Sequence, residues 1–113
     1  METLESAPFE LAVRANDGGT VIELAGDFDL SGTDEFRSCI EALLGSSDGP
    51  LVVDLCDVTF IDSCAIAALL EMQRLVAREH RELRLQRISA PALRLFELTG
   101  LAALFEDSGG PSI

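Results

Sequence analysis

The chain has 113 residues, of which 48% are apolar, and a formal net charge of −12. This size and composition fit one folded domain with one core, and they argue against intrinsic disorder. Residues 1–62 carry 14 acidic side chains against two arginines, whereas residues 63–113 carry six of each. Such an acidic surface repels nucleic acid and anionic lipid, and it favours a basic protein partner or serves solubility alone.

The sequence contains no targeting, membrane or metal-binding pattern. Residues 1–8 have no basic start, and the longest apolar run, 65–70, is far too short to cross a bilayer. The three cysteines follow no CxxC spacing, and the only histidine, His80, lies in a charged cluster. We expect a cytoplasmic protein with reduced thiols, no metal site, no cofactor and no insertion into the membrane. One domain is expected to span the chain, with residues 1–7 and 107–113 as flexible ends.

The first half of the chain predicts a β-hairpin and a helix. Apolar and polar residues alternate over residues 9–14, residues 16–19 form a strong turn signal, and a second strand follows over residues 21–25. Hydroxyl and acidic residues at 31–35 then supply the N-cap and first turn of a helix, which Gly45 ends.

The second half alternates strands with helices. The pattern predicts a buried strand over residues 51–55, a helix over residues 64–78 and another strand over residues 83–88. Residues 89–91 begin a third helix, and residues 104–105 are predicted to form a short final strand. This order predicts an α/β fold with right-handed crossovers, in which helices pack against a mostly parallel sheet of four or five strands after an opening hairpin.

Acidic residues follow two neighbouring strands of this predicted sheet. Asp27 and Asp29 come after the second strand, and Asp62 and Ser63 come after the third. Functional groups in such sheets collect at the carboxyl ends of the strands, so these residues are expected to share one edge.

Asp62 and Ser63 also lie at or next to the N-cap of the helix predicted over residues 64–78. Spacing alone leaves two interpretations of Ser63. Either Ser63 caps the helix with Asp62 as a first-turn acid, or the Ser63 hydroxyl is accessible to a kinase. A phosphate would add about −1.5 to −2 charges to an acidic patch, and it would disturb a docked partner without refolding the domain.

Catalysis by these residues lacks the required groups. A nucleophilic Ser63 needs a base and an oxyanion hole, yet His80 lies several helical turns away and no GxSxG motif is present. Asp27 and Asp62 as an acid and a base would need a deep pocket, and no P-loop or GxGxxG indicates a nucleotide site. We therefore expect no enzyme and no catalytic residue.

Three segments resemble one known family, in the same order. Residues 54–69 resemble the signature of STAS domains in bacterial anti-sigma factor antagonists, where a strand, a Val-Thr-Phe-Ile-Asp-Ser-like run and a helix follow one another. Residues 25–29 look like the Gly-Glu-Leu-Asp element of that family, and residues 88–101 are similar to its last-helix segment. The resemblance covers nearly the whole chain and implies a single STAS-type domain.

The resemblance also implies roles for individual residues. The phosphorylated serine of the family falls on Ser63, the acid before it on Asp62 and the Gly-Glu-Leu-Asp aspartate on Asp29. In that family, an anti-sigma factor that is also a serine kinase binds the unphosphorylated antagonist, releases its sigma factor and then phosphorylates the antagonist; a PP2C-type phosphatase restores it. The implied role is transcription regulation through protein contacts. The partner-binding residues expected here are Asp27, Asp29, Asp62, Ser63, Cys64 and Ala65.

Cys64 and Ala65 depart from the family pattern, which commonly has a second Ser or Thr followed by Gly. Ala65 adds a methyl group where Gly lets another backbone come close, which would favour a different partner or weaken kinase access. Cys64 is expected to be buried as a small apolar side chain, and the alternative is a redox-sensitive thiol at a helix N-terminus.

Two alternative functions remain within the resemblance. One is a STAS regulatory subunit of a membrane transporter, either a lipid-transport ABC system or an anion carrier, although a serine directly after Asp62 suits a phosphorylation switch better. The other is a stressosome-like scaffold, which would assemble into large particles.

Overall fold

The helices and strands follow one another in the predicted order. The structure is a computed structural model, and it describes residues 7–100. Its elements are β1 (Glu10–Asn16), β2 (Gly19–Phe28), α1 (Leu30–Ser46), β3 (Leu51–Ile61), α2 (Ser63–Arg78), β4 (Leu83–Gln86) and α3 (Ala90–Thr99).

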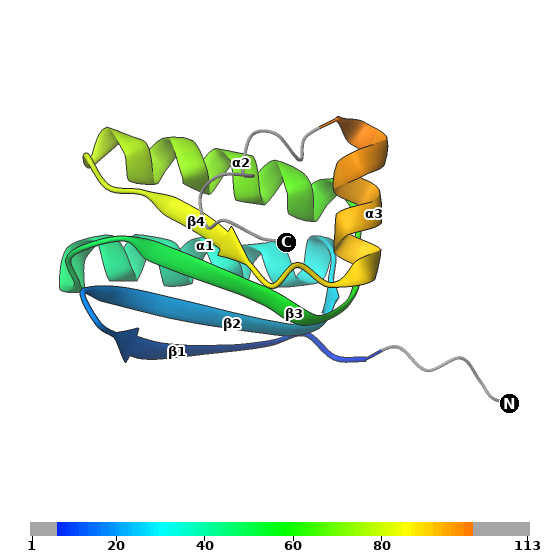
Figure 1. The fold of residues 1–113 in the computed structure, drawn as a ribbon, viewed down its shortest axis with the longest axis horizontal. Helices are drawn as coiled ribbons and strands as arrows, with labels where there is room; N and C mark the ends of the chain where they lie inside the picture. Colours follow the sequence, from blue (N-terminus) through cyan, green and yellow to red (C-terminus); the bar gives the residue numbers. More distant parts are fainter. Residues whose placement is uncertain (1–6, 101–113) are drawn as a thin grey trace, which may run out of the picture.

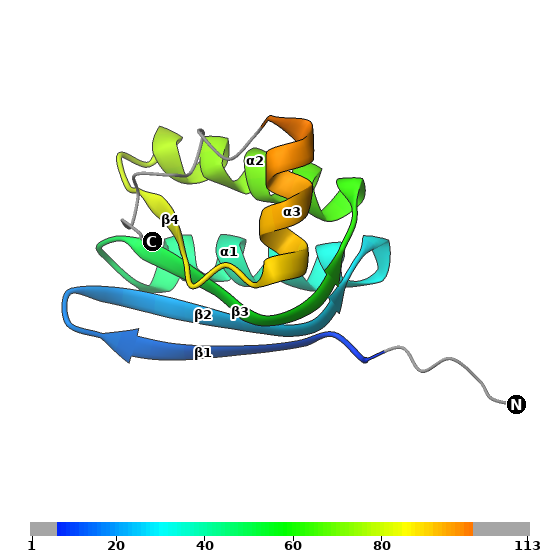
Figure 2. The same ribbon diagram turned by 45° about the vertical axis from the view of Figure 1, so that its right-hand side comes forward.

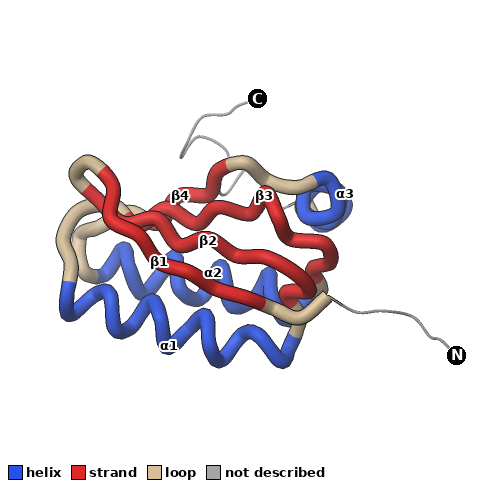
Figure 3. The backbone as a smooth tube through the Cα atoms, turned by 90° about the horizontal axis from the view of Figure 1, so that it is seen from below, coloured by secondary structure: helices blue, strands red, loops and turns tan. Residues whose placement is uncertain are grey.

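The strands form one four-stranded sheet in the order β1-β2-β3-β4. β1 and β2 pair antiparallel as a hairpin, whereas β2 with β3 and β3 with β4 are parallel. α1 and α2 lie on one face of the sheet, which Figure 3 shows most clearly. α3 stands at the end of the sheet where β3 leads into α2 (Figure 1, Figure 2). The predicted single α/β domain is confirmed; the strand predicted at residues 104–105 lies outside the described residues, as do residues 1–6 and 107–113.

The core lies between the sheet and the two helices that cover it. Ile22, Leu24 and Phe28 alternate along β2, and each is at most 1% exposed. Phe28 stacks on Phe9 with ring centroids 5.1 Å apart and meets Phe36 edge-on at 5.4 Å. Because Phe36 belongs to α1, these aromatic contacts fix the start of that helix against the end of β2.

Several elements have boundaries that differ from those predicted, and those of β3 and α1 bear most on the site. β3 continues to Ile61, beyond the predicted range 51–55. Two irregularities in its pairing with β2 interrupt the simple alternation of side chains that would mark the longer strand in the sequence. α1 begins at Leu30, since Asp29 caps it and not a residue within 31–35. Consequently a single residue separates β3 from α2, and no loop lies between them.

The amino ends of β3 and β4 are tied down by Arg81. Its Nε donates to the carbonyl oxygen of Gly49 over 2.8 Å, and its Nη2 donates to the Ser47 hydroxyl over 3.0 Å. Gly49 has a φ of +84°, and a Cβ atom there would overlap the carbonyl oxygen of Gly18. The turns at this end are therefore packed against one another, so they leave the opposite end of the sheet as the place for a functional site.

Candidate functional site

Two helices begin side by side at the carboxyl end of the parallel strands. β2 ends at Phe28 and α1 begins at Leu30, while β3 ends at Ile61 and α2 begins at Ser63. Phe28 and Ile61 are direct partners in the register of β2 with β3. The residues between these strands and helices therefore meet at one edge of the sheet, as predicted.

An aspartate caps each of these helices. Asp29 Oδ1 accepts from the Ser31 backbone N–H over 3.1 Å and from the Ser31 hydroxyl over 2.7 Å. Asp62 Oδ1 accepts from the Ala65 N–H over 3.0 Å. Carboxylates at these positions satisfy backbone donors that have no partner within the helix, and they interact favourably with its dipole. The interpretation of Ser63 as the cap is therefore wrong, because Asp62 has that role.

Ser63 is the first residue of α2, and it is exposed. Its hydroxyl is not needed to cap the helix, and it hydrogen-bonds to no group within residues 7–100. A phosphate on this oxygen would lie at the positive end of the helix dipole, close to unpaired backbone N–H groups. The hydroxyl thus has the exposure that a kinase substrate needs, and the phosphorylated form is not disfavoured by the local backbone.

The sequence predicts that Asp27 follows the second strand, but Asp27 lies within β2. Its Oδ1 accepts from the Thr59 hydroxyl over 2.9 Å, and its backbone is paired with Phe60 on β3. Asp27 therefore lies beside the segment that leads into Ser63. We call Asp27, Asp29 and Asp62 the acidic edge. Within residues 7–100 no group of three or more His, Cys, Asp or Glu side chains is placed to hold a metal ion.

The side chains of Cys64 and Ala65 lie in opposite environments. Cys64 is exposed, so the expectation that it is buried is wrong. Ala65 is 0% exposed and belongs to the core. The methyl group that distinguishes Ala65 from Gly therefore packs inside the domain, and only Cys64 of these two residues offers its side chain to a partner.

Leu30 and Phe60 are exposed apolar residues that the sequence analysis missed. Leu30 is 66% exposed and Phe60 is 49% exposed. Leu30 follows the cap Asp29 directly, and Phe60 is paired with Asp27, so both lie at the acidic edge. Large apolar side chains rimmed by charged groups are typical of protein interfaces. No sequence pattern indicates that Leu30 and Phe60 are exposed together at this edge.

Asp62→Ala is expected to lower the free energy of unfolding by about 1 kcal/mol, because the Ala65 N–H loses its acceptor. Asp62→Ser removes the charge but keeps a capping oxygen, and it should remain close to wild type. Urea denaturation of the two variants measures the difference. Equal destabilisation of both would mean that the charge, and not the cap, is what Asp62 contributes.

The protein is an α/β domain with an opening hairpin, and an exposed serine follows the aspartate N-cap of α2. The chain belongs to the STAS domain family, because the family model described as "Mlab, STAS domain" matches residues 11–106. This confirms the resemblance found in the sequence.

Several similar proteins are anti-sigma factor antagonists. The anti-sigma-B factor antagonist of Bacillus subtilis (strain 168) is 25% identical over 96 residues, which cover 85% of this chain and 87% of that protein. The structure of an anti-sigma factor antagonist from Mycobacterium paratuberculosis has a TM-score of 0.73 at 28% identity, covering 89% of this chain and 87% of that one. Unphosphorylated SpoIIAA, also an anti-sigma factor antagonist, has a TM-score of 0.71 at 19% identity, with 88% and 86% covered, and this supports the fold.

Proposed function

We propose that this protein is an anti-sigma factor antagonist whose binding is controlled by phosphorylation of Ser63. With a free Ser63 hydroxyl it binds an anti-sigma factor that has serine-kinase activity, and a sigma factor is released. Phosphorylation of Ser63 ends the interaction, and a PP2C-type phosphatase restores it. The role is regulatory and not enzymatic, and it places the protein in the cytoplasm, where sigma factors act.

The observation that carries this proposal is the exposed first residue of α2. Ser63 is free of the capping role and lies directly after the Asp62 cap, beside a surface that contains Phe60. A kinase can therefore reach the hydroxyl without unfolding the helix. Because β3 and α2 hold the residue from both sides, adding a phosphate changes the charge and shape of the surface and not the fold.

The size and hydration of a phosphate at an apolar contact explain how it would release a partner, although basic groups of that partner attract its charge. The acidic edge already carries three carboxylates, so a complementary partner presents basic groups around an apolar contact. A phosphate adds about −1.5 to −2 charges and three oxygens in the middle of that contact. Groups that were placed to meet a small neutral hydroxyl then face a large anion, and the apolar contact with Phe60 cannot close around it.

The similar proteins support the same role. SpoIIAA has been determined in a phosphorylated form as well, and that structure has a TM-score of 0.66 to this chain at 19% identity, with 88% of this chain covered. The fold is thus present in both forms of that protein, as a switch that acts at the surface requires.

Phosphorylation of the chain by an anti-sigma factor tests the proposal directly. Each anti-sigma factor of the organism that makes this protein is purified and incubated with the chain and ATP. The mass of the intact chain is then measured by mass spectrometry. We expect one phosphate on the wild type and on Ser31→Ala, which lacks the exposed serine at the start of α1, and none on Ser63→Ala. A factor that binds the chain stably but transfers no phosphate to Ser63 would contradict the proposed switch.

A second candidate function is regulation of a membrane transporter. The anion transporter Slc26a9 contains the same fold, with a TM-score of 0.66 at 20% identity over 81% of this chain and 15% of that one. The description of the matching family model names Mlab and no anti-sigma factor antagonist. Within residues 7–100 no helix is long and apolar enough to cross a membrane. Binding to a transporter ATPase, together with no binding to any anti-sigma factor, would favour this function.

A further inference from the structure

A β-bulge divides β3 into two parts. Glu23 of β2 is paired with Asp54, and Ala25 is paired with Asp57, so Leu55 and Cys56 together lie opposite the single residue between Glu23 and Ala25. An extra residue of this kind turns the side chains that follow it to the other face of the sheet, until the second irregularity between Val58 and Phe60 reverses them again. Because of it Asp57 is exposed and Val58 is 2% exposed, in the core.

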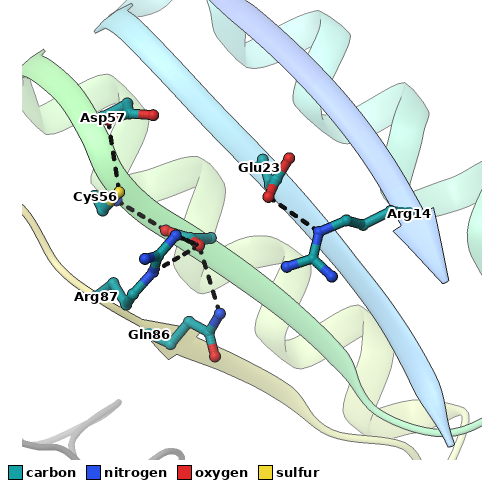
Figure 4. A network of polar contacts seen from close by, with 7 residues as sticks. Arg14, Glu23, Cys56, Asp57, Gln86 and Arg87 are labelled. Atoms are coloured by element: carbon teal, nitrogen blue, oxygen red, sulfur yellow. Dashed lines mark hydrogen bonds and ion pairs between the residues drawn. The ribbon is translucent and has the colours of Figure 1, made fainter. Parts of the chain in front are cut away.

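The bulge is held by the carboxylate of Asp54. Asp54 Oδ1 accepts from the Cys56 backbone N–H over 3.0 Å, and this donor is one that a bulge withdraws from the regular ladder. Asp54 Oδ2 accepts from Arg87 Nε over 2.9 Å and from Arg87 Nη2 over 2.7 Å, and Gln86 lies at 3.5 Å (Figure 4). The carboxylate therefore joins the bulge to the segment that follows β4.

Asp54 is a buried acid whose charge depends on Arg87. The residue is 2% exposed, whereas the Arg87 side chain is 60% exposed. Burial alone would raise the pKa of Asp54, but the hydrogen bonds from Arg87 and Cys56 and the Arg87 charge outweigh it, so the pKa lies below its usual value. Arg87 itself has a φ of +52°, an uncommon backbone conformation for a residue with a side chain.

The segment after Arg87 is fixed to the same part of β3. The Ser89 N–H donates to the carbonyl oxygen of Leu55 over 3.2 Å, and Ser89 then caps α3. The bulge is thus held by Asp54 on one side and by the start of α3 on the other. The residues that follow it along β3 lead without a loop to the acidic edge and Ser63.

We propose that Asp54 and Arg87 are positioning residues: together they hold the β3 bulge, and the bulge, with the second irregularity at Thr59, sets which side chains of residues 57–63 face a partner. Neither residue needs to contact the partner. The binding part of this inference rests on the proposed function, whereas the structural part does not.

The test compares Arg87→Gln with a control on the same face of the sheet. Arg14 pairs with Glu23 over 3.0 Å, and both side chains are about half exposed, so Arg14→Gln removes the same charge from an ion pair that contributes little. Hydrogen exchange of the unbound chain and affinity for the anti-sigma factor are measured for both. In Arg87→Gln we expect exchange of residues 56–63 to rise about tenfold and affinity to fall about tenfold, with neither change in Arg14→Gln.

The pH dependence separates a positioning role from a general loss of stability. The charged groups facing Asp54 and Arg87 are Glu10 of β1, Glu23 of β2 and Asp57 of β3, and Cys56 is the nearest thiol. Without Arg87 these acids and burial raise the pKa of Asp54. Below this raised pKa Asp54 is neutral and stays in place. As the pH is lowered from about 8 to about 5, the protection of residues 56–63 against exchange and the affinity should therefore recover in Arg87→Gln, whereas neither changes in the wild type.

The double variant Asp54→Asn/Arg87→Gln provides a rescue. Its amide oxygen still accepts from the Cys56 N–H, and no buried charge remains, so exchange should return to within about twofold of wild type at every pH. Equal effects of Arg87→Gln and Arg14→Gln, or faster exchange throughout the sheet, would overturn the proposal. If the wild type binds no anti-sigma factor, the proposed function fails, and the exchange data alone decide the role of Asp54 and Arg87.

Discussion

Ser63→Glu is expected to bind the anti-sigma factor about a hundredfold more weakly than the wild type, whereas Ser63→Ala binds about as well. A carboxylate at this position would lie directly after Asp62, on the proposed binding surface at the acidic edge. An unpaired carboxylate that is desolvated at an apolar contact costs several kcal/mol, and about 2.7 kcal/mol corresponds to a hundredfold in Kd. Isothermal titration calorimetry with the purified factor measures both variants.

The matched control for Ser63→Glu is Ser38→Glu. Ser38 is also exposed, and it lies within α1, roughly two turns after the start of that helix. The change in net charge is the same, but the site is away from the acidic edge, so we expect a loss of less than about tenfold. If both variants weaken binding equally, the effect is one of total charge, and Ser63 has no special position.

The sequence predicts the order of elements and the site edge because both depend on local patterns. Strands of alternating or continuous apolar residues, separated by helices with apolar stripes, leave few possible topologies once parallel pairing is inferred. Asp29, Asp62 and Ser63 could be placed at one edge since each directly follows a strand. The exchange of roles between Asp62 and Ser63 could not be predicted, because both residue types are good N-caps and adjacent positions differ by only one residue in register.

The bulges in β3 are the main feature that the sequence did not predict. Strict alternation after Val53 and Leu55 would bury Asp57, and the sequence predicts a strand over residues 51–55 only. In the structure one bulge turns Asp57 outward, and a second irregularity at Thr59 exposes Phe60 and leaves Ile61 5% exposed. Both involve the pairing with β2, and the first is also held by Arg87 through Asp54, so the contacts come from residues that are distant in the sequence. No periodicity within residues 51–61 reports them.

Leu30→Ala/Phe60→Ala is expected to bind the anti-sigma factor about a hundredfold more weakly, with its fold intact. Both side chains are exposed, so their loss removes little core packing, and the free energy of unfolding should change by no more than about 0.5 kcal/mol each. In a complex they would become the apolar centre of a contact rimmed by carboxylates, which is where the strongest single contributions to binding arise. Calorimetry and thermal unfolding on the same samples separate the two quantities.

The control for this double variant is Val13→Ala, which removes another exposed apolar side chain. Val13 on β1 is 45% exposed, close to the 49% of Phe60, and it is paired with Ile22 in the hairpin, away from the acidic edge. Its affinity should therefore equal that of the wild type. A loss of affinity in this control that matches the loss in Leu30→Ala/Phe60→Ala would show that the partner docks elsewhere. Phosphorylation of Ser63 would then have to act at a distance, for which the rigid junction of β3 with α2 provides no mechanism.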